Sequence, residues 1–440
     1  MIVSKAKDRD GDLKMTNLPD WSGLNALADA FRVNGALTSL DISNNRMGDD
    51  GVKLICEALK QNSSLKVLDL NASYTRGGEI GPQGAQYLVD MLSVNGGLTS
   101  IKMSGNDLTD SGGDMTGIKE LAAALGVNGA LTQLDLSHNQ LCGIDADGKG
   151  QYNAEGITAI ADAMRMRVNG GLTVANLLGN QLDAESAKML AEVAKQKGIS
   201  LCGIQRDQTT ADFSLYEPPD AILLASDLSQ AVVTGVLTSL DLEGTLCGLD
   251  SHGRGTYTAE GITAIAEALI VNGVLTGINV RDGDIAGDGA TQLSAAVLGN
   301  IKIEMFNKIP IKEMRADSFT ELDLKGKGFG VVGGMVVAGL IPVMGGLTSI
   351  DLSGNNWLCG IWTDGFGDQQ GTYTAEGIIA IADALRVNGG LTVTNLLGNQ
   401  LDAESAKMLA EVAKLKDISL CGIQRDQTTA DFSSYGLLPP

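Results

Sequence analysis

Carboxylate side chains recur at one position of a short repeated phrase, and their chemistry is the first that suggests a role. In this phrase an aspartate stands between two apolar residues, as in Leu40-Asp41-Ile42 and Leu134-Asp135-Leu136. Eight aspartates occupy the position: Asp41, Asp69, Asp135, Asp212, Asp241, Asp323, Asp351 and Asp431. Carboxylates that stand in a row could attract the basic surface of another protein.

A second group of acidic residues lies in three glycine-rich segments, residues 141–156, 246–261 and 358–377. The oxygen-bearing side chains of the first segment include Asp145, Asp147, Asn153 and Glu155. A calcium loop of the D-x-[DN]-x-[DN]-G kind would need another oxygen ligand where Lys149 stands, and the second segment has His252 and Arg254 there. Residues 8–12 hold another acidic fragment that is only weakly similar to a calcium loop. We therefore expect glycine-rich surface loops rather than a specific calcium site.

The sequence shows none of the patterns that carry catalysis. The two histidines, His138 and His252, lie far apart in the chain, and there is no phosphate loop, nucleophile elbow or metal-ligand spacing. The six cysteines include no C-x-x-C pair, so we expect buried thiols in a reducing compartment. The sequence predicts no catalytic residue, no metal and no cofactor.

The overall charge narrows the class of partner. The chain has 32 Lys+Arg against 53 Asp+Glu, a formal net charge of −21. A nucleic-acid binder needs a basic face, so nucleic acid is an unfavourable partner and a basic protein a favourable one. Residues 1–14 are polar and lack the apolar stretch of a secretory signal, so we expect the cytoplasm or another reducing intracellular compartment.

An internal repeat must position the aspartates. A helix-like apolar pattern leads into Val-Asn-Gly-x-Leu-Thr and then into the Leu-x-Leu phrase. The phrase alternates with period 2, which predicts a short strand, and residues 154–164 show the stripe of an amphipathic helix. Neither element can bury its apolar face alone, so stacked units are expected to form a parallel sheet with helices on one side. The Asn-Gly pair is predicted to stop each helix in a left-handed conformation.

Ten strand positions are clear and three are weaker. The clear ones are Leu40, Leu68, Ile101, Leu134, Ala175, Leu240, Ile278, Leu322, Ile350 and Thr394. The weaker ones are Leu13, Ala211 and Ala430. The asparagines that follow the strands are expected to bond backbone groups of the neighbouring turn, because buried turns need such partners. They are Asn45, Asn106, Asn139, Asn180, Asn355 and Asn399.

This pattern resembles the leucine-rich repeat family, in its long, ribonuclease-inhibitor-like class. The motif reads Leu37-Thr-Ser-Leu40-Asp-Ile42-Ser-Asn-Asn45-Arg-Met47, recurs at residues 131–141, and the likeness runs from about Leu13 to Ser433. The resemblance implies a curved α/β solenoid, a horseshoe with a parallel sheet on the concave face and helices on the convex face. It also implies non-catalytic protein–protein interaction. Because Leu-Asp-Leu is common in that family, the aspartates have a second interpretation, in which they keep the sheet face wet and cap the following turn.

The chain is also duplicated at a larger scale. Residues 172–214 and 391–433 differ only at the pairs Ala175/Thr394, Gln196/Leu415 and Gly198/Asp417. We therefore predict two copies of one array, residues 1–218 and 219–440, which continue as one solenoid.

One predicted helix carries no charge. Residues 328–350 are uncharged, but their seven glycines and Pro342 argue against a transmembrane span. On a convex surface this helix would need a cover, so it is a candidate apolar contact site. Its contact residues would be Val331, Val332, Met335, Val336 and Leu340.

The functional prediction is a protein-interaction scaffold or adaptor with an acidic concave surface. Two alternatives remain open. One is a structural subunit of a large assembly, which the bare helix favours. The other is a GTPase-activating protein of the Ran-activating type, whose acidic C-terminal tail this sequence lacks.

Overall fold

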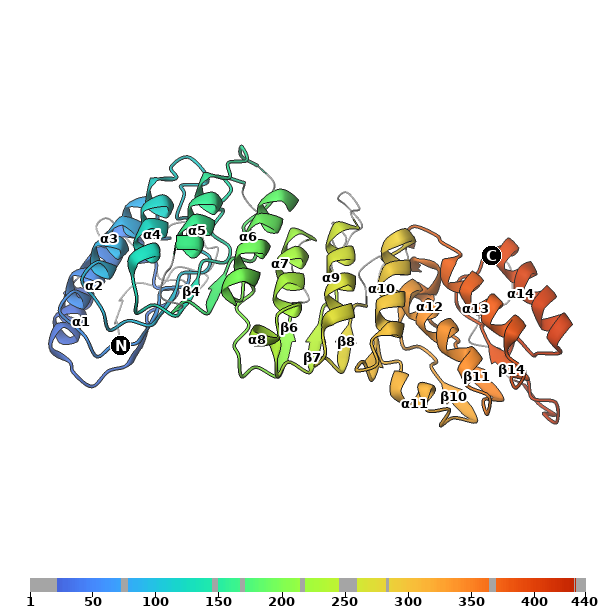
Figure 1. Cartoon of the computed structure of the whole chain (residues 1–440). Helices are drawn as coiled ribbons and strands as arrows, with labels where there is room; N and C mark the ends of the chain where they lie inside the picture. The colour runs from blue at the N-terminus through green and yellow to red at the C-terminus, as the bar shows by residue number, and fades with distance from the viewer. Residues whose placement is uncertain are drawn as a thin grey trace. The chain divides into compact units, whose positions relative to one another are not determined.

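The chain folds as two compact units, Met1–Ile204 and Gln205–Pro440. The computed structural model describes residues 22–72, 78–144, 149–166, 171–213, 218–244, 259–281, 285–363, 369–430 and 432. In each unit, helices alternate with short parallel strands (Figure 1). Among the described helices, none has both the length and the hydropathy that crossing a bilayer requires. That the two arrays continue as one solenoid stays a prediction.

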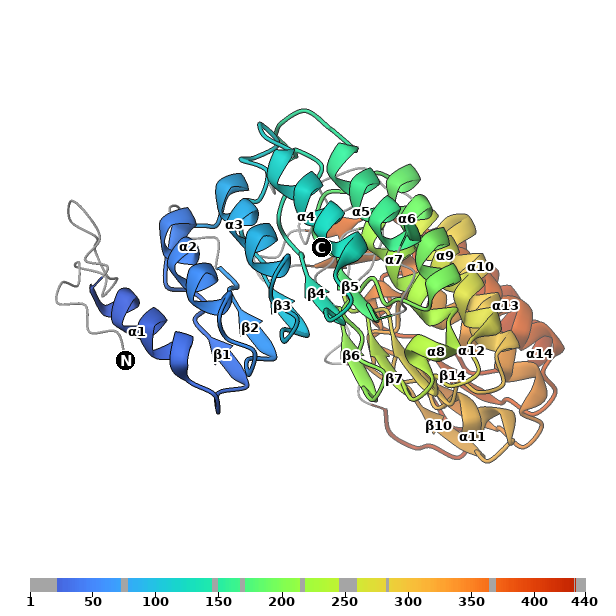
Figure 2. The ribbon, with the colours of Figure 1, turned by 60° about the vertical axis from the view of Figure 1, so that its left-hand side comes forward.

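The first unit holds one parallel sheet. Its strands, in spatial order, are β1 (Ser39–Asp41), β2 (Val67–Asp69), β3 (Ser100–Lys102), β4 (Gln133–Asp135) and β5 (Val174–Asn176). Its helices are α1 (Ser22–Val33), α2 (Gly48–Leu59), α3 (Pro82–Leu92), α4 (Thr116–Val127), α5 (Glu155–Met166) and α6 (Ala184–Lys197). Successive helices pack on one another along one side of the sheet (Figure 2).

The second unit holds two parallel sheets and a hairpin. One sheet contains β6 (Thr210–Asp212), β7 (Ser239–Asp241), β8 (Gly277–Asn279) and β9 (Met305–Phe306). The other contains β10 (Glu321–Asp323), β11 (Ser349–Asp351) and β14 (Val393–Asn395), and the antiparallel hairpin is β12 (Ile361–Thr363) with β13 (Gln369–Gly371). The helices are α7 (Pro218–Leu228), α8 (Ala231–Thr234), α9 (Glu260–Val271), α10 (Gly287–Gly299), α11 (Ile311–Arg315), α12 (Gly330–Leu340), α13 (Glu376–Val387) and α14 (Ala403–Lys416), with 3₁₀ turns η1 (Ile341–Val343) and η2 (Asn356–Cys359).

The strand predictions can be checked one by one. All ten clear positions lie in strands, and the weaker Ala211 lies in β6. Leu13 falls outside the described residues. The prediction of a strand at Ala430 is wrong. The residue that pairs with β14 is instead Ser419, which bridges Val393 as Ser200 bridges Val174 of β5.

The buried asparagines behave as expected. Asn180 is fully buried, and its Nδ2 donates to Leu136 O and Leu177 O at 3.0 and 2.8 Å, while its Oδ1 accepts from Asn139 N at 2.9 Å. Equivalent bonds are made by Asn106, Asn355 and Asn399. The asparagine side chains thus join the turns of adjacent repeats.

The predicted helix stop is wrong in its mechanism. After α4, Asn128 is extended, with φ −71° and ψ 116°, and Gly129 has no positive φ. The Asn128 Oδ1 instead accepts from Ala130 N and Leu131 N at 3.0 and 2.9 Å, and its Nδ2 donates to Leu92 O of α3 at 3.1 Å. The side chain, not a left-handed backbone, ends the helix and ties it to the preceding one.

The uncharged helix α12 is not an exposed contact surface, which corrects the prediction made for it. Val331, Val332, Val336 and Leu340 are all at most 4% exposed, and Met335 is half-buried. Helices α10 and α13 and the turn η2 cover these side chains. Its exposed position, residue 339, is a glycine. The helix is uncharged because it is internal to the second unit.

Candidate interaction site on the strand face

The aspartates of the repeated phrase stand side by side across the paired strands. In the first unit Asp41 pairs with Asp69, and the column continues through Lys102, Asp135 and Asn176. In the second unit it reads Asp212, Asp241, Asn279 in one sheet and Asp323, Asp351, Asn395 in the other. Neighbouring strands lie about 4.8 Å apart. We call these residues the strand-face column; Asp431 falls outside the described residues.

Six of the column carboxylates also stabilise their own turns. One oxygen accepts from the backbone N–H two residues later, at 2.8–3.1 Å, in Asp41, Asp69, Asp135, Asp241, Asp323 and Asp351. This bond closes an Asx turn where the strand ends. The hydrogen bonds from Ser43 hold the pKa of Asp41 below its ordinary value. The geometry therefore agrees with the second interpretation of the aspartates, and it leaves part of each carboxylate for another partner.

Two stretches of the column already have a cation of the chain itself within them or beside them. In the first unit Lys102 Nζ lies 3.2 Å from Asp69 Oδ2. In the second unit Arg281 Nη2 lies 2.6 Å from Glu243 Oε2, and both side chains are at most 34% exposed.

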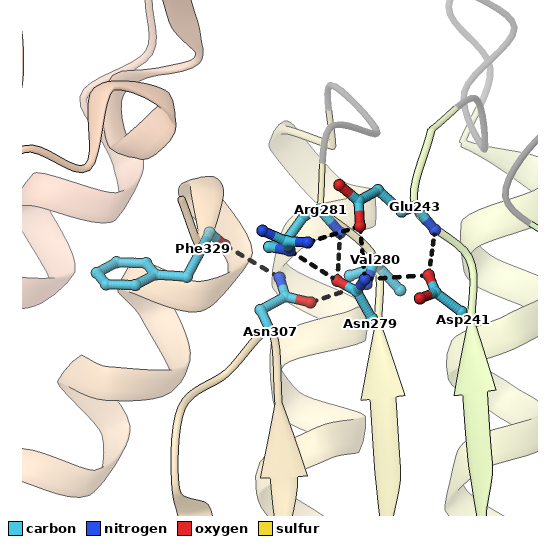
Figure 3. A network of polar contacts seen from close by, with 7 residues as sticks. All are labelled: Asp241, Glu243, Asn279, Val280, Arg281, Asn307 and Phe329. Carbon is cyan, nitrogen blue, oxygen red and sulfur yellow. Dashed lines mark hydrogen bonds and ion pairs between the residues drawn. The ribbon is translucent and has the colours of Figure 1, made fainter. Parts of the chain in front are cut away.

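The Arg281 pair belongs to a network at the ends of β7, β8 and β9 (Figure 3). Asn279 Nδ2 donates to Asp241 Oδ1 and Glu243 Oε2 at 3.0 and 2.9 Å, and Arg281 Nε donates to Asn279 Oδ1 at 3.1 Å. The sequence analysis missed this pair. The signal was present, because Glu243 and Arg281 each stand two residues after a column position of adjacent strands.

The third stretch of the column differs from the other two. Asp323 and Asp351 are adjacent and in register, and neither makes an ion pair within the described ranges. Asp351 Oδ1 accepts from Ser353 N at 2.8 Å, and its Oδ2 accepts from Asn395 Nδ2 at 3.1 Å. A pocket of about 300 Å³ opens beside Asp351, lined also by residues 421–424, Gln427 and Phe432.

The glycine-rich segments are anchored at their bases. Tyr152 Oη shares a 2.6 Å hydrogen bond with Ser186 Oγ and accepts from Asp183 N at 3.3 Å. In the second unit Tyr373 makes the same two contacts with Ser405 and Asp402, at 2.8 and 3.3 Å. The tips, with Asp145, Asp147, His252 and Arg254, lie outside the described residues. In the ranges that are described, no three His, Cys, Asp or Glu side chains come together to hold a metal.

The thiols are mostly buried. Burial raises the pKa of Cys142 to about 12 and that of Cys359 to about 11, so both are protonated at neutral pH. Cys56 and Cys202 are also buried, whereas Cys421 is exposed, contrary to the expectation for that residue. Cys247 falls outside the described residues.

Comparison with known proteins agrees with this architecture. Two family profiles described as "Leucine Rich repeat" match, one at residues 36–56 and 98–115 and the other at residues 130–148. A stretch of 65 residues is 43% identical to human "NACHT, LRR and PYD domains-containing protein 13". The stretch makes up 14% of this chain and 6% of that protein. The chain thus spans only a small part of the length of that relative.

Two solved structures show limited likeness. The tropomodulin C-terminal domain of Caenorhabditis elegans matches with a TM-score of 0.31 and 11% identity, over 40% of this chain and 92% of that one. Leiomodin-1 actin-binding site 2 matches with a TM-score of 0.30 and 17% identity, over 41% and 91%.

The chain is a leucine-rich-repeat protein with an α/β solenoid architecture of parallel strands and packed helices. Domains of this family generally mediate protein–protein interaction.

Proposed function

We propose that the chain is a non-catalytic protein-interaction scaffold whose strand-face column binds basic surfaces of other proteins. The observation that supports this most is the strand register, which brings Asp41 beside Asp69, Asp212 beside Asp241, and Asp323 beside Asp351. Like charges at this spacing repel one another, so a cationic partner that neutralises them gains binding energy. The turn bonds fix the carboxylates in place before a partner arrives.

The turn bonds also make the column easy to test. Asparagine can accept the same backbone hydrogen bond without the charge, and Asn176, Asn279 and Asn395 already do so in this chain, each at 3.3 Å. A variant with asparagine at six column positions should therefore fold and lose only its charge. The six positions are Asp41, Asp69, Asp135, Asp241, Asp323 and Asp351.

The control removes the same number of charges from exposed helix positions. The amide replaces the acid at Asp50, Asp90, Glu185, Glu192, Glu267 and Glu411. The native chain and both variants are immobilised, and bound proteins are quantified by mass spectrometry over a salt series. Basic proteins should bind the native chain and the helix variant but not the column variant. They should dissociate as ionic strength rises. If the column variant retained the same partners as the native chain, the proposed function would be wrong.

A further inference from the structure

The pocket beside Asp351 is formed by the chain folding back over the strand face. After α14, Ser419 continues the sheet next to β14, and Cys421 then forms an antiparallel bridge with Asn395. Gly422 has φ +73°, and a Cβ added there would lie 3.2 Å from the Asn395 side chain. Residues that follow Gly422 line the same pocket as β11 and β14. The result is a second wall opposite the column.

Hydrogen bonds hold that wall in shape. Gln424 N donates to Gln427 Oε1 at 2.9 Å, and Gln427 N donates to Gln424 O at 3.2 Å. Gln427 Nε2 donates to Thr429 O at 2.6 Å. Phe432 completes the lining. The pocket is therefore bounded by a carboxylate, by amides and by one aromatic ring.

The pocket, rather than its hydrogen bonds, distinguishes Asp351 from the rest of the column, because Asp241 likewise accepts from a backbone N–H and from an asparagine Nδ2. Asp69 is paired with Lys102, and Glu243 next to Asp241 is paired with Arg281. Within the described part of the chain, the donors to Asp351 are Ser353 N and Asn395 Nδ2, and both are neutral. An ionised carboxylate has about four acceptor sites, so two remain for a ligand.

We propose that this pocket receives the guanidinium group of an arginine side chain from a protein partner. The inference rests on the proposed function and assigns one position of the column as an anchor. A guanidinium is planar and carries five donors, which fit a carboxylate in pairs, and its flat face stacks on an aromatic ring such as that of Phe432. A volume of about 300 Å³ admits one such side chain and lies at the lower limit of small-ligand pockets.

The test uses the full chain and three blocked pentapeptides, Gly-Gly-X-Gly-Gly, in which X is arginine, lysine or citrulline. Citrulline has the shape of arginine without its charge. Binding is followed by NMR, through the side-chain amide signals of Asn395, Gln424 and Gln427. The arginine peptide should bind at least tenfold more tightly than the citrulline peptide, and the lysine peptide should fall between them.

Two variants and a matched control locate the binding. Asp351→Asn should weaken the arginine peptide at least tenfold, and Phe432→Leu about threefold. Asp323→Asn should change its affinity less than twofold, because that residue makes the same turn bond on the adjacent strand but does not line the pocket.

Other outcomes overturn the proposal in distinguishable ways. If Asp323→Asn and Asp351→Asn weaken binding equally, or if citrulline binds like arginine, the pocket is not an arginine site. Retention of basic proteins by the native chain but not by the six-asparagine variant would then leave the broader function intact. A failure of both experiments would remove the pocket and the proposed function together.

Discussion

At the scale of single residues, the column aspartates combine a structural and an electrostatic property in one side chain. Asp135 Oδ1 accepts from both Ser137 N and Ser137 Oγ, at 3.0 and 2.7 Å. The bond needs an acceptor at this atom but not a charge, as Asn176 on the next strand demonstrates. Turn formation alone would permit asparagine throughout. The proposed binding of a basic partner would account for the preference for aspartate at this position.

Thr394 offers a test of polar burial with an internal reference. Its side chain is fully buried, and its Oγ1 has no hydrogen-bond partner within the described ranges, whereas the other copy has Ala175 here. An unsatisfied buried hydroxyl costs about 1–3 kcal/mol. Thr394→Val keeps the shape and removes the hydroxyl, so it should raise the free energy of unfolding by about 1 kcal/mol in urea titrations. The reverse change, Ala175→Thr, should lower it; a stabilising Ala175→Thr would contradict this account.

His138 should make stability depend on pH near neutrality. Burial lowers its pKa, and attraction to Asp135 opposes that shift only partly. The unfolded chain therefore takes up a proton at higher pH than the folded chain does. The contribution to stability is complete above the unfolded pKa of about 6.5 and is lost as pH falls toward the lower folded pKa. The unfolding free energy should decrease between pH 7 and pH 5.

His138→Asn should flatten that part of the profile. The residue has φ 54°, and Asn44 occupies the equivalent turn with φ 58°, so asparagine fits the backbone. His252→Gln serves as the comparison. Calorimetric or denaturant profiles that stay steep in His138→Asn would assign the pH dependence to other groups.

At the scale of elements, neighbouring repeats are joined by side chains as well as by strand pairing. Asn180 spans two turns, and removing it orphans buried backbone groups of both. Asn180→Ala should therefore cost about 3 kcal/mol. Asn45 holds the same position in an earlier repeat but is exposed, and among the described residues it bonds only Ile42 O and Ser43 O. Asn45→Ala should cost less than about 1 kcal/mol. Equal losses of stability in the two variants would contradict the role of the buried asparagines in joining adjacent repeats.

Because α12 is covered within its own unit, shortening one of its side chains should destabilise the fold, whereas the same change on a docking helix would not. Val336 is fully buried between neighbouring helices of its unit. Val336→Ala should lower the unfolding free energy by about 2 kcal/mol, because it leaves a cavity. On a free contact surface the same change would be nearly neutral, so an unchanged denaturation midpoint would restore the original interpretation.

The elements also show what sequence could and could not reveal. Strands with the Leu-x-Leu phrase, such as β1 and β10, were predicted, because period 2 and a following turn are local signals. The pairing of Ser200 with β5 and of Ser419 with β14 was missed. Both serines begin a Ser-Leu-Cys segment, which lacks the phrase and can be recognised only from the strand that pairs with it. The covering of α12 could not be predicted either, because uncharged helices look alike whether a partner or the same chain covers them.

At the scale of the whole molecule, the sequence predicted that the aspartates stand in a row, but it did not predict that their surroundings differ from one sheet to the next. The register that aligns Asp41, Asp69 and Asp135 follows from the repeat. The neutralisation by Lys102 and Arg281 depends on which residues fall on adjacent strands, and the pocket depends on a segment that folds back from beyond α14. Such contacts between repeats are invisible to a search for motifs within one repeat.

The near-identity of residues 172–214 and 391–433 has a kinetic consequence. Each block comprises a strand, a helix (α6 or α14) and the serine that pairs with that strand. During refolding either block can dock where the other belongs, and such a swapped intermediate keeps almost every native contact of the block. Escape would require the misplaced helix to detach, which predicts a slow refolding phase. Making the blocks identical through Thr394→Ala, Leu415→Gln and Asp417→Gly should enlarge the amplitude of that phase in stopped-flow experiments.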